Sequence, residues 1–229
     1  MILRSTERSV SNALERWLMP PLFTRICNPP AFSITFGAKV IEKAGGLHIL
    51  VNNGGISQRS NAFDTDLSVD RRIMEINYFG NVALTKAVLP HFREQENGNF
   101  IVLSSVTGKF GFYLRSAYAA SKHALHGFYE SLRLEEEEHG IMATLVCPGR
   151  VVTNISINSV TQDGSSYGKM DPGQAAGMPV DECARQIIEA MQEGREEVTI
   201  GSIKERLGVW MKRHFPKIFG QMIRGSSPT

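Results

Sequence analysis

Four short apolar segments alternate with longer segments in which apolar residues recur at three- and four-residue steps. The short segments are rich in β-branched and large apolar residues and show no polar alternation, which is typical of strands buried on both faces of a parallel sheet. They span 48–51 (HILV), 100–104 (FIVLS), 143–147 (ATLVC) and 197–200 (EVTI). The periodic segments predict helices over about 36–44, 66–93, 117–138 and 180–192. The pattern therefore predicts an α/β fold with a doubly wound parallel sheet and helices on both faces.

Three segments depart from this pattern. Residues 1–35 contain two Pro-Pro pairs but neither a buried strand nor a glycine-rich turn, and we leave them unassigned. Residues 155–177 are rich in Ser, Gly, Asn and Gln without apolar periodicity, which predicts a mobile loop or lid. Residues 202–229 form a basic amphipathic segment. We expect one domain over 36–201, flanked by these two ends.

Charge and cysteine content exclude several classes of protein. The 25 basic and 23 acidic residues leave a net charge of +2, which does not predict nucleic-acid binding. The three cysteines are widely spaced, so we expect neither disulfides nor a metal site. This pattern favours a reducing compartment. No apolar run is long enough to span a bilayer, and charges interrupt the first 28 residues where a signal peptide would be apolar. The protein is expected to be cytoplasmic or peripherally membrane-associated.

The strongest chemical signal is the run Tyr118-Ala-Ala-Ser-Lys122. Residues four apart share a helix face, so Lys122 is expected to lie near the Tyr118 phenol and to lower its pKa toward the operating pH. Tyr118 is therefore a candidate general acid/base. Ser105, at the end of an expected strand, is positioned to hold a substrate oxygen, and Ser104 is the less favoured partner.

These residues, together with Asn77 upstream, resemble the catalytic tetrad of the short-chain dehydrogenase/reductase family. Ser105, Tyr118 and Lys122 follow one another at the family's thirteen- and four-residue steps. The resemblance implies a Rossmann-like fold and hydride transfer between a nicotinamide cofactor, NAD or NADP, and an alcohol or carbonyl. It also implies that the main chain of Asn77 holds a water linking the lysine to solvent, and that Lys122 binds the nicotinamide ribose.

Two further motifs support the resemblance. Asn52-Asn53-Gly54-Gly55 is similar to the family's NNAG element, with Gly54 in place of alanine. In the family this element stabilises the central sheet and passes near the adenosine of the cofactor. The run from Pro148 to Thr153 is similar to the family's PGxxxT turn. The implied cofactor-binding residues are Asn52, Asn53, Gly54, Tyr118, Lys122, Pro148, Gly149, Val151 and Thr153.

The family's TGxxxGxG loop, which receives the cofactor pyrophosphate, has no counterpart in this sequence. Two interpretations follow. One is an N-terminally truncated or misassigned start of an otherwise standard reductase. The other is a shortened, non-catalytic protein that binds or dimerises without the cofactor phosphate site. We favour the first, because the tetrad would have no chemical purpose without the cofactor.

The C-terminal segment interleaves Trp and Phe with lysine and arginine, and Pro216 interrupts it. Such a segment is compatible with peripheral contact to a membrane, or with packing at a substrate pocket or dimer interface. Its apolar character predicts a lipophilic small-molecule alcohol or carbonyl substrate. The helices carrying Asn77 and Tyr118 resemble those of the family's dimer interface, so a homodimer or tetramer is expected, with no nucleic-acid partner.

Overall fold

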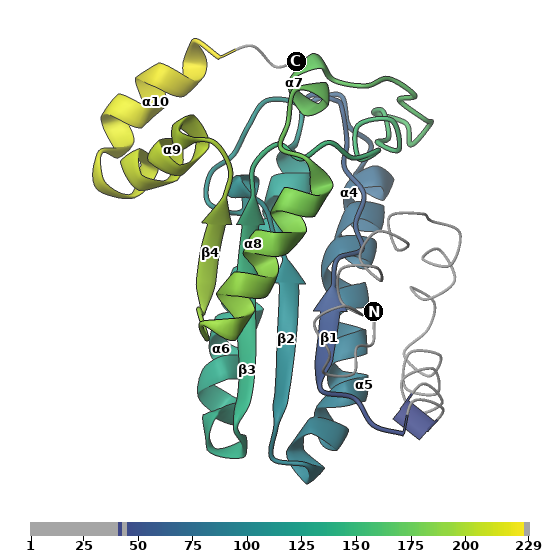
Figure 1. Ribbon diagram of the computed structural model, residues 1–229. Helices are drawn as coiled ribbons and strands as arrows, with labels where there is room; N and C mark the ends of the chain where they lie inside the picture. Colours follow the sequence, from purple (N-terminus) through teal and green to yellow (C-terminus); the bar gives the residue numbers. More distant parts are fainter. Residues whose placement is uncertain (1–40, 43–44, 227–229) are drawn as a thin grey trace.

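The computed structural model describes residues 41–42 and 45–226. Its centre is a parallel sheet in the order β1-β2-β3-β4 (Figure 1). The strands are β1 (Ile49–Asn52), β2 (Gly98–Leu103), β3 (Ile141–Pro148) and β4 (Glu197–Ile200). In the register, Leu50 pairs with Phe100 and Val146 pairs with Val198. All four expected strands are present within about two residues of the predicted bounds.

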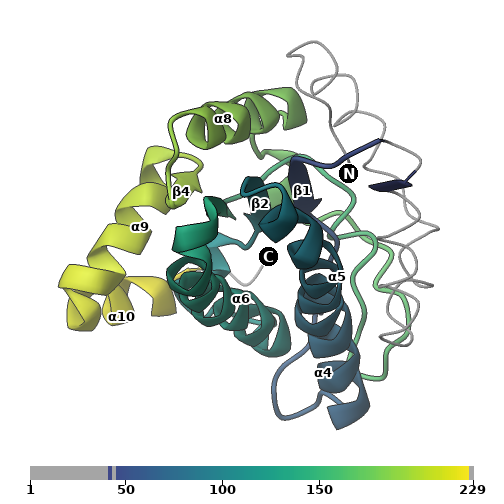
Figure 2. The same ribbon diagram turned by 90° about the horizontal axis from the view of Figure 1, so that it is seen from below.

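Helices cover both faces of this sheet, as the doubly wound prediction requires. One face carries α4 (Leu67–Met74), α5 (Gly80–Glu94) and α6 (Ser116–Glu136), and the other carries α8 (Val180–Gln192) (Figure 2). The first face buries the larger core, in which Phe92, Phe100 and Tyr129 are fully enclosed. On the second face, α8 packs its Cys183 side against Ile101 and Val146 of the sheet.

The expected helix over 66–93 is interrupted by a π-helical turn, Glu75–Phe79, between α4 and α5. The apolar pattern does not reveal this turn, because one extra residue per turn leaves the buried stripe almost continuous. Such turns are rare and occur frequently at functional sites. This one carries Asn77, whose side chain is fully buried.

Residues 155–177 are more ordered than the expected loop. They include the short helix α7 (Pro172–Ala175) and isolated bridges that join Val160 to Gln58 and to Ser166. Ser156 and Asp171 are buried within this segment. This segment is held in place by polar contacts with residues far away in the sequence, and the local pattern of polar and apolar residues does not indicate such contacts.

The C-terminal segment forms two helices, α9 (Ile203–His214) and α10 (Pro216–Arg224), beside the carboxyl end of β4 (Figure 1). Ser202 begins α9 with a capping box in which Glu205 is the reciprocal partner. The break falls at Pro216, as predicted. In the part of the chain that the structure describes, none of the helices combines the length and apolarity needed to cross a membrane.

Two expectations concern residues outside the described part of the chain. The unassigned segment 1–35 lies wholly outside it, and so does most of the helix expected over 36–44, of which Ile41 and Glu42 are described and helical.

Candidate active site

A cavity of about 1370 Å³ lies at the carboxyl ends of the strands. Open parallel sheets bind their ligands at this edge. Tyr118, Lys122 and Ser105 line the cavity together, so the structure brings three of the four expected catalytic residues to one space. Helices α9 and α10 add apolar side chains to the cavity lining, among them Leu207, Phe219 and Met222.

Tyr118 and Lys122 share the expected face of α6. The Lys122 ammonium lies 5.7 Å from the centroid of the Tyr118 ring and donates a 2.7 Å hydrogen bond to the Leu103 carbonyl. Gln58 fixes the start of this helix, because its Oε1 accepts a 2.9 Å hydrogen bond from the Tyr118 amide, which has no partner within the helix.

The expected lowering of the Tyr118 pKa is wrong. Burial raises the pKa of Tyr118, and this effect exceeds the opposing effects of a hydrogen bond with Ser105 and the charges of Arg59 and Arg115. Burial also lowers the pKa of Lys122 to about 8. The same loss of water thus disfavours the charged form of both groups, and it weakens the lysine charge on which the prediction depended.

The two adjacent serines point in different directions. The Ser105 hydroxyl accepts hydrogen bonds from the Thr107 amide (3.1 Å) and hydroxyl (3.0 Å) at the cavity wall. The Ser104 hydroxyl instead donates to the Lys122 carbonyl at 3.1 Å and lies 3.0 Å from Nε2 of His126, both on α6. Both serines line the cavity, and the preference for Ser105 as the residue that holds a substrate oxygen stays a prediction.

Asn77 connects the loop after β1 to the catalytic helix. Its Oδ1 accepts from the Ile56 amide at 2.8 Å, and its Nδ2 donates to the Ile56 carbonyl and to the Ser121 hydroxyl, both at 2.9 Å. Ser121 in turn donates to the Tyr118 carbonyl at 2.8 Å. The main-chain carbonyl of Asn77, which the resemblance assigns to a water, accepts a 2.6 Å hydrogen bond from Asn81. Asn77 therefore contacts α6 through Ser121 and does not line the cavity.

The residues from Asn52 to Gly55 have two different surroundings: some pack within the fold, and others line the cavity. Asn52 faces the helices, where its amide donates to the Thr85 hydroxyl (3.0 Å) and the Tyr129 hydroxyl (2.7 Å). Asn53 and Gly55 line the cavity, whereas Asn52 and Gly54 do not. A Cβ on Gly55 would lie 3.0 Å from Asn77 Oδ1 and 3.5 Å from Lys122 Nζ, so glycine keeps this wall open beside the lysine.

The proline-glycine turn brings its expected residues to the cavity: Pro148, Gly149, Val151 and Thr153 all line it. Gln174 covers part of this wall, since its amide donates to the Val151 carbonyl and lies 3.4 Å from the Thr153 hydroxyl. Glu205 holds the turn from the other side by accepting a 2.7 Å hydrogen bond from the Arg150 amide.

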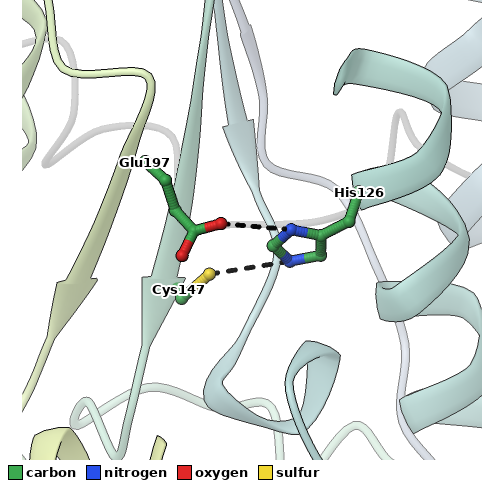
Figure 3. A group of neighbouring side chains, drawn as sticks. All are labelled: His126, Cys147 and Glu197. Atoms are coloured by element: carbon green, nitrogen blue, oxygen red, sulfur yellow. Dashed lines mark hydrogen bonds and ion pairs between the residues drawn. The ribbon is translucent and has the colours of Figure 1, made fainter. Parts of the chain in front are cut away.

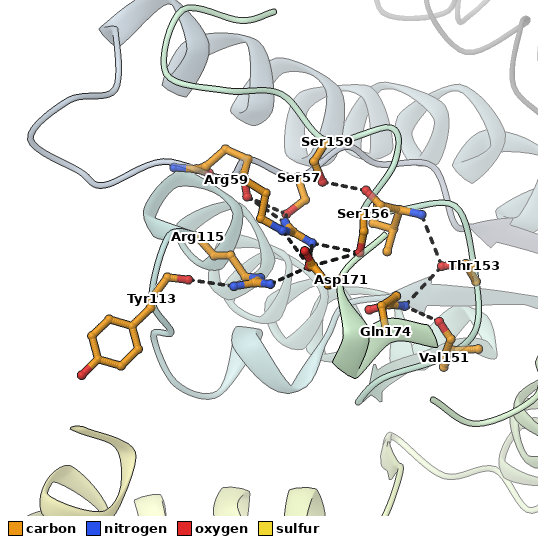
Figure 4. Close-up of polar contacts among 12 residues, drawn as sticks. Ser57, Arg59, Tyr113, Arg115, Val151, Thr153, Ser156, Ser159, Asp171 and Gln174 are labelled. Carbon is orange, nitrogen blue, oxygen red and sulfur yellow. Dashed lines mark hydrogen bonds and ion pairs between the residues drawn. The ribbon is translucent and has the colours of Figure 1, made fainter. Parts of the chain in front are cut away.

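A buried charge network beside Tyr118 was not expected from the sequence (Figure 4). Arg59 and Arg115 both line the cavity and both bond Oδ2 of Asp171, at 2.7 and 3.0 Å. Burial alone would raise the pKa of Asp171, but hydrogen bonding and the charges of the two arginines hold it below its ordinary value. Burial and the nearby Arg59 lower the pKa of Arg115 to about 10. No short motif marks this network, because its members lie 56 and 112 residues apart.

Comparison with known proteins agrees with this geometry. A family model described as short chain dehydrogenase matches residues 32–164. Dehydrogenase/reductase SDR family member 7B of Xenopus laevis is 43% identical over 185 residues, which cover 81% of this chain and 57% of the relative. Dehydrogenase/reductase SDR family protein 7-like of Anopheles gambiae is 44% identical over 180 residues, 79% of this chain and 57% of the relative. The chain thus spans a little over half the length of these relatives.

Solved structures share the fold. A short-chain dehydrogenase from Streptomyces avermitilis aligns with a TM-score of 0.68 and 25% identity over 88% of this chain and 79% of its own. A short chain dehydrogenase from Burkholderia cenocepacia, solved in complex with NADP, aligns with a TM-score of 0.70 and 21% identity over 86% of this chain and 75% of its own. The matching family model, the relatives and the shared fold place this chain in the short-chain dehydrogenase/reductase family.

Proposed function

We propose that this chain is the catalytic part of an NAD(P)-dependent oxidoreductase that interconverts a carbonyl and an alcohol on a lipophilic substrate. The observation that carries the proposal is the convergence of Ser105, Tyr118 and Lys122 on one cavity at the carboxyl ends of the strands. The relative solved with NADP supports the choice of cofactor class.

The residues present fit the nicotinamide end of such a cofactor. Gly55 leaves space beside the Lys122 ammonium, and Val151 and Thr153 line the same cavity. Lys122 would hold the ribose, while Val151 and Thr153 would hold the carboxamide after Gln174 moves aside. A bound nicotinamide dinucleotide supplies the hydride or accepts it.

The protein supplies the proton that the reduction of a carbonyl requires. The raised pKa of Tyr118 keeps its phenol protonated at neutral pH, so that the phenol can donate its proton to a carbonyl oxygen that becomes an alcohol. Ser105 faces the same space and would hold that oxygen by a hydrogen bond. Asn77 and Ser121 keep the Tyr118 backbone in position through the chain of contacts described above. In this protonation state the phenol is a proton donor, which is the form that carbonyl reduction uses.

The apolar part of the cavity lining supports a lipophilic substrate. Phe110 and Phe219 are in tilted contact with ring centroids 5.0 Å apart, and both line the cavity with Met222 and Ile223. A long apolar group lying against this wall would leave its carbonyl end at the polar side, between Ser105 and Tyr118.

The outer side of α9 and α10 supports contact with an anionic membrane surface. Ile203, Trp210 and Ile218 are 83%, 51% and 54% exposed, and none of them lines the cavity. Six exposed basic residues accompany them: Lys204, Arg206, Lys212, Arg213, Lys217 and Arg224. Glu205 is the sole acidic residue in these two helices. Apolar burial combined with attraction to anionic headgroups favours interfacial binding. Sedimentation with phosphatidylserine-containing vesicles should fall in Trp210→Ala and not in Leu134→Ala, which removes an exposed apolar residue on α6.

A second copy of the chain is the proposed partner for the α5 and α6 side, where Phe79 and Leu134 are exposed apolar residues on the helices that carry Asn77 and Tyr118. Light scattering coupled to size exclusion should show a dimer or tetramer, and a monomer at all protein concentrations would contradict this.

The first test is a fluorescence titration of the chain with NADH and NADPH, using Lys122→Ala against Lys86→Ala, which removes an exposed lysine. Saturable binding that Lys122→Ala weakens and Lys86→Ala preserves supports the proposal. Turnover of aliphatic and aromatic carbonyls should then be lost in Tyr118→Phe and retained in Tyr113→Phe, an exposed tyrosine outside the cavity wall. Failure to bind either dinucleotide would favour the alternative of a non-catalytic binding or dimerising form.

A further inference from the structure

Between the catalytic helix and the sheet, three metal-ligating side chains from three elements meet in one place (Figure 3). His126 of α6, Cys147 of β3 and Glu197 of β4 each direct one ligand atom to within 4.8 Å of the other two (Figure 3). Cys147 Sγ lies 3.6 Å from Nε2 of His126, and Glu197 Oε2 lies 3.5 Å from Nδ1. Cys147 is fully buried and His126 is nearly so.

This cluster is separate from the candidate active site. His126, Cys147 and Glu197 do not line the cavity, and the proposed proton transfer uses none of them. Ser104 lies between the two places, since its hydroxyl contacts both the Lys122 carbonyl and Nε2 of His126. The sequence predicted no metal site because Cys147 and Glu197 lie 21 and 71 residues from His126 and form no ligand motif.

The cluster already holds a positive charge. The Lys109 ammonium forms an ion pair with Glu197 and lies 3.1 Å from Nδ1 of His126. Glu130 is a more distant acidic neighbour, 3.8 Å from the same nitrogen. The Lys109 side chain is 22% exposed, which gives its ammonium a route to solvent.

We propose that His126, Cys147 and Glu197 form a binding site for a borderline-soft divalent cation, Zn²⁺ in the first place, in competition with the Lys109 ammonium. Nitrogen, thiolate and carboxylate ligands are the set that Zn²⁺ takes, and three protein ligands leave the fourth tetrahedral position to water or to the Ser104 hydroxyl.

Binding requires one proton to leave. Cys147 is a buried free cysteine, and Zn²⁺ binds cysteine as the thiolate. Formation of the Zn–S bond releases the S–H proton to solvent, while the Lys109 ammonium turns outward and retains its charge. The resulting thiolate and the Glu197 carboxylate then neutralise the two charges of the ion. Because the ligands come from α6, β3 and β4, the metal would join the catalytic helix to the last two strands.

The test is a Zn²⁺ titration of the untagged full chain by calorimetry, repeated with Co²⁺, whose thiolate charge-transfer absorption reports a cysteine ligand. We expect one ion per chain. Cys147→Ser should weaken binding by more than about a hundredfold, because changes outside the ligand set alone cost 10- to 100-fold. Cys183→Ser, which removes a buried cysteine on α8, is the matched control and should bind as the parent does.

Lys109→Met gives an independent result that does not alter a ligand. Removing the competing ammonium should tighten Zn²⁺ binding about tenfold or more, since a unit charge within a few ångströms repels the ion strongly at low dielectric. Equal binding by the parent, Cys147→Ser and Lys109→Met would overturn the proposal. So would a Co²⁺ complex of the parent without thiolate absorption, or no binding to either the parent or Lys109→Met.

Discussion

Replacing Asn77 with alanine tests whether the π-helical turn holds the site together. The Asn77 side chain is fully buried and forms three hydrogen bonds, two with the backbone of Ile56 and one with Ser121. Alanine removes all three without supplying another partner. The Ser121 hydroxyl keeps its bond to the Tyr118 carbonyl, so the unpaired groups are the amide and the carbonyl of Ile56.

The magnitude follows from these two groups. A buried polar group left without a partner costs about 1–3 kcal/mol, and Ile56 is only partly buried, so water reaches it in part. We therefore expect Asn77→Ala to lower the free energy of unfolding by about 2–4 kcal/mol. This is a large share of the roughly 5–15 kcal/mol that stabilises a typical domain. Affinity for NADPH should fall as well, because the loop after β1 and the Tyr118 backbone lose their link.

Urea unfolding followed by far-ultraviolet circular dichroism measures the change. Asn61→Ala is the matched control, because Asn61 is exposed and its amide bonds only Asp64, so the cost should stay within about 0.5 kcal/mol. An Asn77→Ala midpoint as close to the parent as that of Asn61→Ala would refute the view that Asn77 clamps the site.

Three further results are expected. Gly98→Ala should cost more than 1 kcal/mol in urea unfolding, because its Cβ would lie 2.1 Å from a ring carbon of the fully buried Phe92, whereas Gly111→Ala, with no atom within 4 Å, should be neutral. The lowered pKa of Lys122, about 8 when folded against 10.5 when unfolded, means that the unfolded chain binds more protons between these values. The buried lysine therefore lowers the free energy of unfolding by about 3 kcal/mol below pH 8, and this cost disappears as the pH rises to 10.5. The difference in unfolding free energy between the parent and Lys122→Met should change between these two pH values and stay constant below about pH 7. Glu205→Ala should lower stability by about 0.5–2 kcal/mol and speed amide exchange in the first turn of α9, because it removes the capping box.

The strands and most helices could be predicted because their signals are local. An apolar run such as FIVLS reports burial on both faces, and the helical period over 180–192 coincides with the bounds of α8. The π-helical turn could not be predicted, since one inserted residue hardly changes the apolar stripe. The order of residues 155–177 depends on contacts such as that of Asp171 with Arg59, which lie 112 residues apart and leave no local pattern.

The site shows the same division between position and environment. The four-residue step correctly predicted that Lys122 and Tyr118 share a face, because helix geometry alone determines that. It could not predict their protonation, because that depends on how much water the surrounding elements exclude. Burial opposes the charged form of both groups, and the arginines that partly offset it at Tyr118 come from other segments. A motif therefore identifies which groups meet, whereas their protonation depends on burial and on residues such as Arg59 and Arg115 that lie outside every motif.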